Sequence, residues 1–446
     1  MAPGTGSRLE PPAVAEAYRR VRAQTLALID GLSPEDCMVQ SMAEASPVKW
    51  HLAHVTWFFE TLVLEEFLPR LGQTHTPFDP QFRVLFNSYY NGVGAFHPQP
   101  RRGVLSRPSL QDVLSYRASV DERILRLLQR LSDEDAAHPV LGAIELGLHH
   151  EQQHQELILT DIKHHFSCNP VAPALRAGVA EAVPASATRA LAWIAQDGGK
   201  VEIGHRGPGF AFDNEMPAHH VWVEPCEIAQ RLVTNGEYRE FLRDGGYRRP
   251  ELWLSDGWDL VSDAGWSRPL YWREDGSVFT LSGLRAIDDG EPVCHVSYYE
   301  ADAFARWAGA RLPTEFEWEH VTRRAQDGAD STAGAPGLCG RFLEDGRLHP
   351  AALSPLVRPD AVGQLLGDVW EWTQSAYLPY PGFRTRDGAA SEYNGKFMVN
   401  QMVLRGGSCA TPEDHIRATY RNFFRASARW QFSGIRLARS GAGRAS

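Results

Sequence analysis

VLGAIELGLHHEQQHQELILTDIKHHF, residues 140–166, is the most informative segment of this 446-residue chain. Its apolar residues recur at intervals of three and four, which predicts one long helix. His150 and His154 stand four positions apart, so a helix projects both imidazoles from one face. Two imidazoles at this spacing can bind one metal ion, although an ordinary polar helix face shows the same pattern.

Three further segments, 13–29, 47–68 and 110–131, have the same helical periodicity. Four long helices in this order favour a four-helix bundle. Two clusters, SPED at 33–36 and SDED at 132–135, are typical of helix starts, because a capping residue precedes acidic side chains. Residues 72–108 form a long loop rich in Pro, Gly and aromatic residues, and loops of this length are often functional.

The segment 47–68 contains Trp50-His51-Leu52-Ala53-His54 within an otherwise apolar helix. A histidine on such a face is ordinarily a hydrogen-bonded core residue. Helix bundles, however, build metal sites from side chains on facing helices. His54 together with His150 and His154 would supply three neutral nitrogen donors and leave other coordination positions open, as zinc and non-haem iron enzymes require.

The second half of the chain differs from the first in its sequence pattern. Residues 12–168 are predicted to form the helical domain, and 169–190, rich in Ala, Pro and Val, the linker. Residues 191–446 contain many Gly-rich turns and short strand-like pieces at 200–204, 220–224 and 277–281. Helices are expected at 234–243 and, after Ser297 as cap, at 298–308. This pattern predicts an α+β domain.

Composition excludes several classes of function. The 45 basic and 55 acidic residues give a net charge of −10, and no long basic run occurs, so nucleic acid and anionic membranes are not expected partners. No apolar run reaches the roughly 18–20 residues needed to span a bilayer. Six dispersed cysteines and an N-terminal segment without an apolar signal core predict a reduced, cytoplasmic protein.

The motifs WHLAH (50–54) and HEQQH (150–154) resemble the DinB-like bundle of the non-haem iron sulfoxide synthases of ergothioneine biosynthesis, the EgtB type. The second half resembles the formylglycine-generating-enzyme-like domain, which is related to C-type lectins. The matching pieces are DNE (213–215), VTNGEY (233–238), RLPTEFEWE (311–319), GDVWEWT (367–373), LRGGS (404–408) and GIRL (434–437). The resemblance implies a two-domain fold, a DinB-like four-helix bundle followed by this lectin-like α+β domain.

The resemblance also implies a reaction. Fe(II) would be held by His54, His150 and His154, and O2 would be the co-substrate. The enzyme would join the sulfur of cysteine to C2 of the imidazole of Nα-trimethylhistidine (hercynine) and form a sulfoxide. In this family the glutamine at the position of Gln153 helps to hold the imidazole substrate.

A proton donor is also required. The loop FNSYYNGVG (86–94) carries Tyr89 and Tyr90, and it resembles the cysteine-using branch, in which an adjacent tyrosine pair serves. In the branch that uses γ-glutamylcysteine, the tyrosine comes from the second domain. Tyr377 and Tyr380 are the alternatives here.

The thiol substrate is suggested by Asn422-Phe423-Phe424, which stands where the γ-glutamylcysteine branch has Asn-Trp-Asp. Asn422 and Phe423 are expected to contact trimethylhistidine. Phe424 removes the acidic partner of the longer thiol, which favours cysteine. Arg101 and Arg102 are the predicted partners of the cysteine carboxylate.

Other interpretations remain open at this point. His150, Glu151 and His154 satisfy the HExxH pattern of zinc hydrolases. An ovothiol-type synthase would attack C5 of histidine, although such enzymes usually carry a methyltransferase domain for which the chain has no room. A non-enzymatic ligand-binding protein is a third alternative. Formylglycine generation is disfavoured, because Cys409 stands alone where a reactive cysteine pair is needed.

Overall fold

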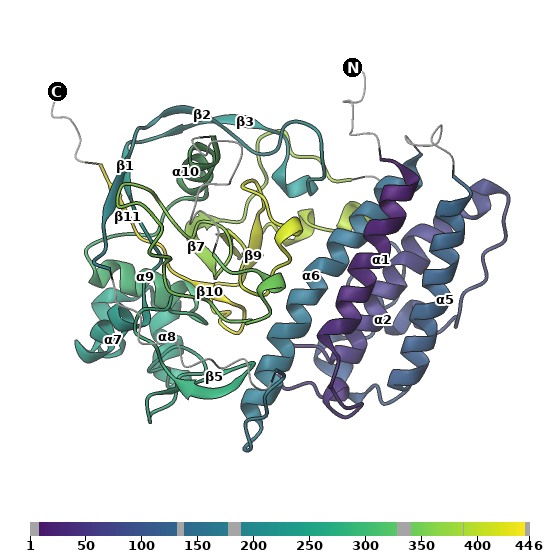
Figure 1. Cartoon of the computed structure of the whole chain (residues 1–446), viewed down its shortest axis with the longest axis horizontal. Helices are drawn as coiled ribbons and strands as arrows, with labels where there is room; N and C mark the ends of the chain where they lie inside the picture. The colour runs from purple at the N-terminus through teal and green to yellow at the C-terminus, as the bar shows by residue number, and fades with distance from the viewer. Residues whose placement is uncertain (1–8, 132–137, 177–188, 328–339, 387, 442–446) are drawn as a thin grey trace. The chain divides into compact units, whose positions relative to one another are not determined.

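A computed structural model describes residues 9–131, 138–176, 189–327, 340–386 and 388–441 (Figure 1). The chain divides into two compact units. The helical unit comprises Met1–Val171 together with two short segments, Gly207–Phe210 and Thr385–Tyr393. The α+β unit comprises the remainder of the chain. The two short segments come from within the predicted second domain, 191–446, so the helical unit is discontinuous in sequence.

Four long helices among the described residues of the helical unit confirm the four predicted segments. They are α1 (Pro11–Leu28), α2 (Val48–Phe59), α5 (Leu110–Gln129) and α6 (Pro139–Cys168), drawn as long coiled ribbons in Figure 1. Helix α2 continues through a π-helical turn, η2 (Glu60–Leu64), into the short α3 (Glu65–Phe67). Helix α5 begins at a capping box in which Ser109 and Asp112 bond each other's backbone N–H.

The predicted helix start at 33–36 is wrong beyond a single turn. Ser33 and Asp36 do exchange backbone-to-side-chain hydrogen bonds, of 2.9 and 3.1 Å, as a capping box would. Only the three-residue 3-10 helix η1 (Asp36–Met38) follows, because Val39 turns the backbone to an extended conformation. The other predicted start, 132–135, lies outside the described residues. Helix α6 instead begins after His138, which caps the backbone of Val140.

The long loop 72–108 contains the short helix α4 (Phe82–Leu85) and the 3-10 helix η4 (Gln99–Val104). Two tryptophans of α2 hold it in place. The indole N–H of Trp50 donates to the carbonyl of Leu85, at 3.1 Å, and that of Trp57 donates to the carbonyl of Arg83, at 3.2 Å. The loop is therefore fixed against α2, the helix that carries His51 and His54.

In the described part of the α+β unit there are short strands and four α-helices. The strands form a three-stranded sheet in the order β1-β4-β11, a four-stranded sheet in the order β10-β7-β8-β9, and two hairpins, β2-β3 and β5-β6. The helices are α7 (Asn235–Arg243), α8 (Ser255–Ala264), α9 (Tyr298–Trp307) and α10 (Glu315–Asp327). The strands are β1 (Trp193–Gln196), β2 (Gly199–Ile203), β3 (His219–Val223), β4 (Cys226–Ala229), β5 (Ser277–Thr280), β6 (Gly283–Ala286), β7 (Trp370–Ala376), β8 (Met402–Arg405), β9 (Asn422–Phe424), β10 (Ser433–Gly434) and β11 (Ala438–Ser440).

The core of this unit joins three of the motifs found in the sequence. The buried carboxylate of Glu371 accepts hydrogen bonds from the guanidinium of Arg436, at 2.8 and 2.9 Å, and from the indole of Trp318, at 2.8 Å. Gly406 lies in a fourth motif with φ of +101°, and a Cβ there would stand 2.7 Å from the carbonyl oxygen of Leu365. These contacts explain why the motifs need their charged, aromatic and glycine residues.

The predicted strands at 200–204, 220–224 and 277–281 and the helices at 234–243 and 298–308 are confirmed, with shifts of one residue at their ends. Ser297 caps α9 as expected, in a capping box with Glu300. Across the part of the chain that the structure describes, no helix is both long enough and apolar enough to cross a bilayer.

Candidate metal centre

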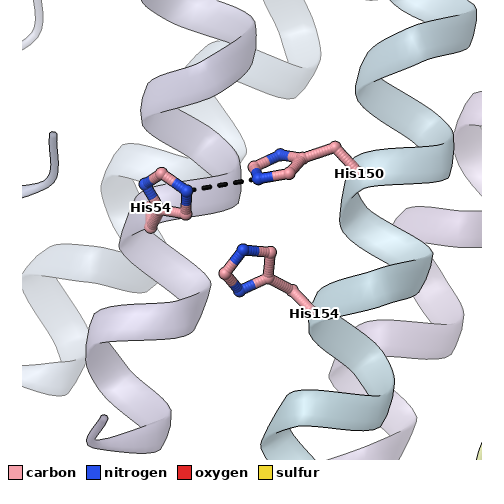
Figure 2. A group of neighbouring side chains, drawn as sticks. All are labelled: His54, His150 and His154. Atoms are coloured by element: carbon pink, nitrogen blue, oxygen red, sulfur yellow. Dashed lines mark hydrogen bonds between the residues drawn. The ribbon is translucent and has the colours of Figure 1, made fainter. Parts of the chain in front are cut away.

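Three histidines converge between helices α2 and α6. His54 extends from α2, and His150 and His154 extend from successive turns of α6 (Figure 2). One ring nitrogen of each lies within 4.8 Å of the corresponding nitrogens of the other two. The Nε2 atoms of His54 and His150 are 3.2 Å apart. All three residues are at least 92% buried. The structure thus brings together the three residues that the sequence selects as metal ligands.

Burial keeps these imidazoles neutral. It lowers the pKa of His150 to about 3, and lowers the pKa of His54 and of His154 well below 6.5. The neighbouring histidines lower the last two pKa values further, because two imidazolium ions cannot be accommodated side by side. A neutral imidazole has the lone pair that binds a metal ion, so the site is poised for coordination at neutral pH.

Aromatic rings surround the triad and limit access of water. Trp50 stacks on His54 with ring centroids 4.7 Å apart, and Phe58 lies 4.4 Å from His150. The Nδ1–H of His54 donates to the carbonyl oxygen of Phe86, at 2.6 Å, which leaves Nε2 directed at the other two rings. A histidine ligand is commonly fixed in this way through its second nitrogen.

Glu151, the acidic residue of the HExxH pattern, is bonded to side chains of other helices. Its buried carboxylate accepts hydrogen bonds from Arg22, at 2.9 Å, from Thr25, at 2.6 Å, and from Arg117. Burial alone would raise the pKa of Glu151, but the two guanidinium groups lower it to about 2. A carboxylate held in this ion cluster is a structural anion and gives no support to a zinc hydrolase in which it acts as general base.

Gln153 is bonded to a tyrosine that sequence reasoning missed. The hydroxyl of Tyr393 donates to the side-chain oxygen of Gln153, and the Tyr393 ring lies 5.7 Å from that of His150. Tyr393 is buried and belongs to the segment Thr385–Tyr393 of the helical unit. No local pattern marks this segment, because it lies 240 residues after Gln153 and reaches the bundle only through tertiary packing.

Tyr89 and Tyr90 lie in the loop that also supplies the Phe86 carbonyl. Their rings stack at 4.6 Å, and Tyr90 is fully buried against Trp57 and Phe58, which themselves contact His54 and His150. Burial raises the pKa of Tyr90 well above 10, so its hydroxyl remains protonated. The Tyr89 hydroxyl donates to the backbone oxygen of Tyr393, at 3.4 Å. The tyrosine pair is therefore part of the shell around the triad.

The two predicted arginines have different environments. Arg102 is buried, and its guanidinium carbon lies 3.4 Å from the centroid of the Trp50 ring. It donates to the hydroxyl of Ser46, at 2.8 Å, and burial lowers its pKa to about 9. Arg101 is exposed and lines a surface groove of about 500 Å³ with Met38, Gln40 and Val104. Only Arg102 is built into the shell of the triad.

The remaining predicted residues belong to the α+β unit. Asn422 and Phe423 lie on β9, where the Asn422 side chain accepts from the Phe423 backbone N–H, at 2.9 Å. Phe423 stacks on Tyr377 with centroids 4.1 Å apart. Tyr377 accepts a hydrogen bond from Asn214, at 2.9 Å, and Tyr380 contacts Arg405, at 2.9 Å. Both of these tyrosines are thus engaged in buried networks of that unit.

The donor set fits a divalent transition metal. Three neutral imidazoles from two helices form one side of a site, and no carboxylate of the described residues, of the kind that would favour calcium or magnesium, belongs to this cluster. Nδ1 of His150 is buried and has no hydrogen-bond partner among the described residues. Three protein ligands leave further positions for substrates, which is the arrangement of a catalytic rather than a structural ion.

Comparisons with known proteins agree with the division of the chain into a helical unit and an α+β unit. The family model of the DinB superfamily matches residues 17–158, and that of the sulfatase-modifying factor enzyme 1-like domain matches residues 179–441. A formylglycine-generating enzyme of Streptomyces coelicolor is 31% identical over 57% of this chain and 88% of its own.

Hercynine oxygenases match this chain over nearly its full length. The hercynine oxygenase of Mycolicibacterium thermoresistibile is 33% identical over 94% of this chain and 92% of its own. That of Mycobacterium tuberculosis is 34% identical over 96% and 99%, respectively. The chain therefore belongs to the hercynine oxygenase family, the non-haem iron sulfoxide synthases that its histidine motifs resemble.

Proposed function

We propose that this chain is an Fe(II)- and O2-dependent sulfoxide synthase that joins the sulfur of cysteine to C2 of the imidazole of hercynine and forms hercynyl-cysteine sulfoxide. One observation carries the proposal: a buried, neutral three-histidine site lies beside the hydrogen-bonded pair Gln153 and Tyr393 in a member of the hercynine oxygenase family.

His54, His150 and His154 would hold the iron. Bound there, Fe(II) supplies the oxygen activation and the shared coordination that bring a thiolate and an imidazole together. The rings of Trp50 and Phe58 pack against two of these histidines and make the surroundings apolar, which would limit side reactions with water.

Gln153 would bind the imidazole of hercynine, as its family position implies. The bond from the Tyr393 hydroxyl fixes the orientation of the Gln153 amide, so the substrate ring meets a group already in place. Asn422 and Phe423 would bind the other end of this substrate. The stacked rings of Phe423 and Tyr377 are the type of surface that attracts a trimethylammonium group.

Tyr89 and Tyr90 would supply the proton that directs oxygen reduction toward the sulfoxide. The raised pKa of Tyr90 keeps this proton on the phenol oxygen until a strong base is formed nearby. Without such a donor, thiol oxidation would compete with carbon–sulfur bond formation.

Cysteine is the preferred thiol in this proposal. Phe424 packs against Trp430, with centroids 5.9 Å apart, where the γ-glutamylcysteine branch carries an acidic residue. A phenyl ring offers no charge partner for the amino group of the longer thiol. Arg102, a buried cation without a carboxylate at hydrogen-bonding distance among the described residues, would bind the cysteine carboxylate.

The test uses the full chain, purified without oxygen and loaded with Fe(II). It is mixed with hercynine, O2 and either cysteine or γ-glutamylcysteine, and the products are identified by mass spectrometry and NMR. We expect a C2-linked sulfoxide, a higher kcat/KM with cysteine, and no product from the His150→Ala variant. A product linked at C5, or formed only from unmethylated histidine, would assign the ovothiol reaction. A higher kcat/KM with γ-glutamylcysteine would refute the interpretation of Phe424.

A further inference from the structure

His51, the first histidine of the WHLAH motif, links a metal ligand to a buried carboxylate. Its Nδ1 lies 2.8 Å from Nδ1 of His154, and its Nε2 lies 3.0 Å from Oδ2 of Asp161. His51 and Asp161 are 3% and 5% exposed, so the connection is shielded from water. Asp161 follows His154 by two turns of α6, and His51 reaches both of them from α2.

The positions of the protons on the His51 and His154 rings follow from the hydrogen bonds of Asp161. Its Oδ2 accepts the backbone N–H of Ser46, at 2.8 Å, and a carboxylate oxygen can only accept from His51 as well. The His51 proton therefore lies on Nε2. A neutral His51 then has its lone pair on Nδ1, so the short contact requires that His154 donate from its own Nδ1.

We infer that His51 and Asp161 are positioning residues that hold His154 in the tautomer whose Nε2 can bind a metal ion. The opposite tautomer, with the proton on Nε2, would block the lone pair that faces His54 and His150 (Figure 2). The inference rests on the proposed metal site, and it does not depend on which reaction the site performs.

The three proposed ligands differ in the group that orients each imidazole ring. His54 is oriented by the backbone carbonyl of Phe86, and Nδ1 of His150 has no partner among the described residues. His154 alone is backed, through His51, by a carboxylate. Partners of this kind fix the ring and increase the basicity of the ligand, and their loss typically lowers metal affinity about 10-fold to 100-fold.

The same carboxylate is connected to the proposed thiol site. Ser46, which donates its backbone N–H to Asp161, accepts a hydrogen bond at its hydroxyl from Arg102, at 2.8 Å. Asp161 is also the anion whose charge supports the buried Arg102 cation. The positioning of His154 and of Arg102 therefore depends on one buried anion.

The first experiment measures the tautomer directly. The metal-free full-length protein is labelled with 15N-histidine, and long-range 1H–15N correlation spectra identify which His154 nitrogen carries the proton. We expect the Nδ1–H form in the wild-type protein and its loss in His51→Phe. An Nε2–H form in the wild-type protein, or an unchanged Nδ1–H form in His51→Phe, would overturn the inference.

The second experiment measures metal affinity by anaerobic titration with Fe(II), and with Co(II) as a coloured substitute. His51→Phe and Asp161→Leu should raise the Kd about 10-fold to 100-fold. Asp161→Asn should have a smaller effect, because an amide oxygen still accepts both hydrogen bonds, and this variant preserves side-chain volume if the others fold poorly. Thr160→Val is the matched control, since Thr160 is buried on α6 and its hydroxyl, among the described residues, bonds only the Leu157 carbonyl, at 3.0 Å.

Equal Kd values for Asp161→Leu, Asp161→Asn and Thr160→Val, together with an unchanged Co(II) absorption spectrum, would refute the role of Asp161. Neither experiment contains hercynine or a thiol. A wild-type protein that binds Fe(II) and shows the expected tautomer, but forms no sulfoxide, would therefore refute the proposed function and leave this inference intact.

Discussion

The hydroxyl of Tyr393 donates a hydrogen bond to the side-chain oxygen of Gln153, the residue directly before the metal-site histidine His154 of α6. Tyr393→Phe removes this bond and leaves the ring in place. A hydrogen bond is worth about 0.5–1.5 kcal/mol, so the KM for hercynine should rise about 2-fold to 12-fold, with little change in the KM for cysteine. Steady-state kinetics check this, with Tyr299→Phe on α9 as control. An equal rise for both substrates would contradict it.

Glu151 is expected to act in folding. Glu151→Gln leaves the buried guanidinium groups of Arg22 and Arg117 without their anion, which should cost about 3–5 kcal/mol in the free energy of unfolding. Urea denaturation measures this loss. In the control, Glu122→Gln breaks only the exposed pair with Arg126 and should change stability by less than about 1 kcal/mol. A Glu151→Gln protein with normal stability and no activity would instead indicate a catalytic base.

Replacement of both Tyr89 and Tyr90 by Phe should redirect turnover. The stacked, buried rings are retained, and only the phenolic protons are lost. We expect less sulfoxide and more oxidised cysteine per O2 consumed, which product analysis by mass spectrometry together with an oxygen electrode measures. An unchanged ratio of sulfoxide to oxidised cysteine would exclude Tyr89 and Tyr90 as the proton donors and make Tyr393 the next candidate.

Arg101 and Arg102 are a natural matched pair for the thiol site. Arg102→Met should raise the KM for cysteine at least about 10-fold, because a charged hydrogen bond is worth about 1.5–3 kcal/mol. Arg101→Met should leave it unchanged, since Arg101 is exposed in the groove beside Val104. Arg102→Lys keeps the charge and should recover part of the loss. The reverse order of the two Met variants would show that the exposed arginine binds the thiol.

The pH dependence of stability should report the buried histidines. An unfolded chain binds protons at His150 below about pH 6.5, whereas the folded chain resists them to about pH 3. This part of the stability is therefore complete above pH 6.5 and falls as pH decreases, by up to about 1.4 kcal/mol per pH unit for each such histidine.

Urea denaturation of the metal-free protein at pH 7.5, 6 and 5 measures this slope. His150→Gln should make the slope shallower, whereas Thr160→Val, which removes no titratable group from α6, should not. A slope that is the same in His150→Gln and in the wild-type protein would indicate that His150 is already protonated in the folded state.

Much of the fold was predictable because it depends on local patterns. The periodicity of 140–166 identified α6, and the spacing of His150 and His154 placed them on one face. The prediction that a helix starts at SPED, residues 33–36, was wrong because a capping box can start a helical turn but cannot extend that turn into a long helix. The five-residue pattern HExxH could not show that Glu151 faces Arg22 and Arg117, since those partners lie on other helices.

The parts of the site that escaped prediction depend on contacts distant in sequence. The sequence assigned no role to His51, because Asp161, its partner on another helix, lies 110 positions away. The placement of Arg102 beneath Trp50, rather than in solvent with Arg101, depends on the conformation of the loop 72–108. Neither pattern nor propensity specifies such contacts.

The segment Thr385–Tyr393 has a consequence for any attempt to divide this protein into separately encoded parts. Because it packs with the bundle while being encoded inside the gene region for the α+β unit, a gene fragment for residues 1–171 encodes the three histidines but not Tyr393. Transplantation of residues 1–171 alone would therefore transfer the three histidines without the hydroxyl group that bonds Gln153.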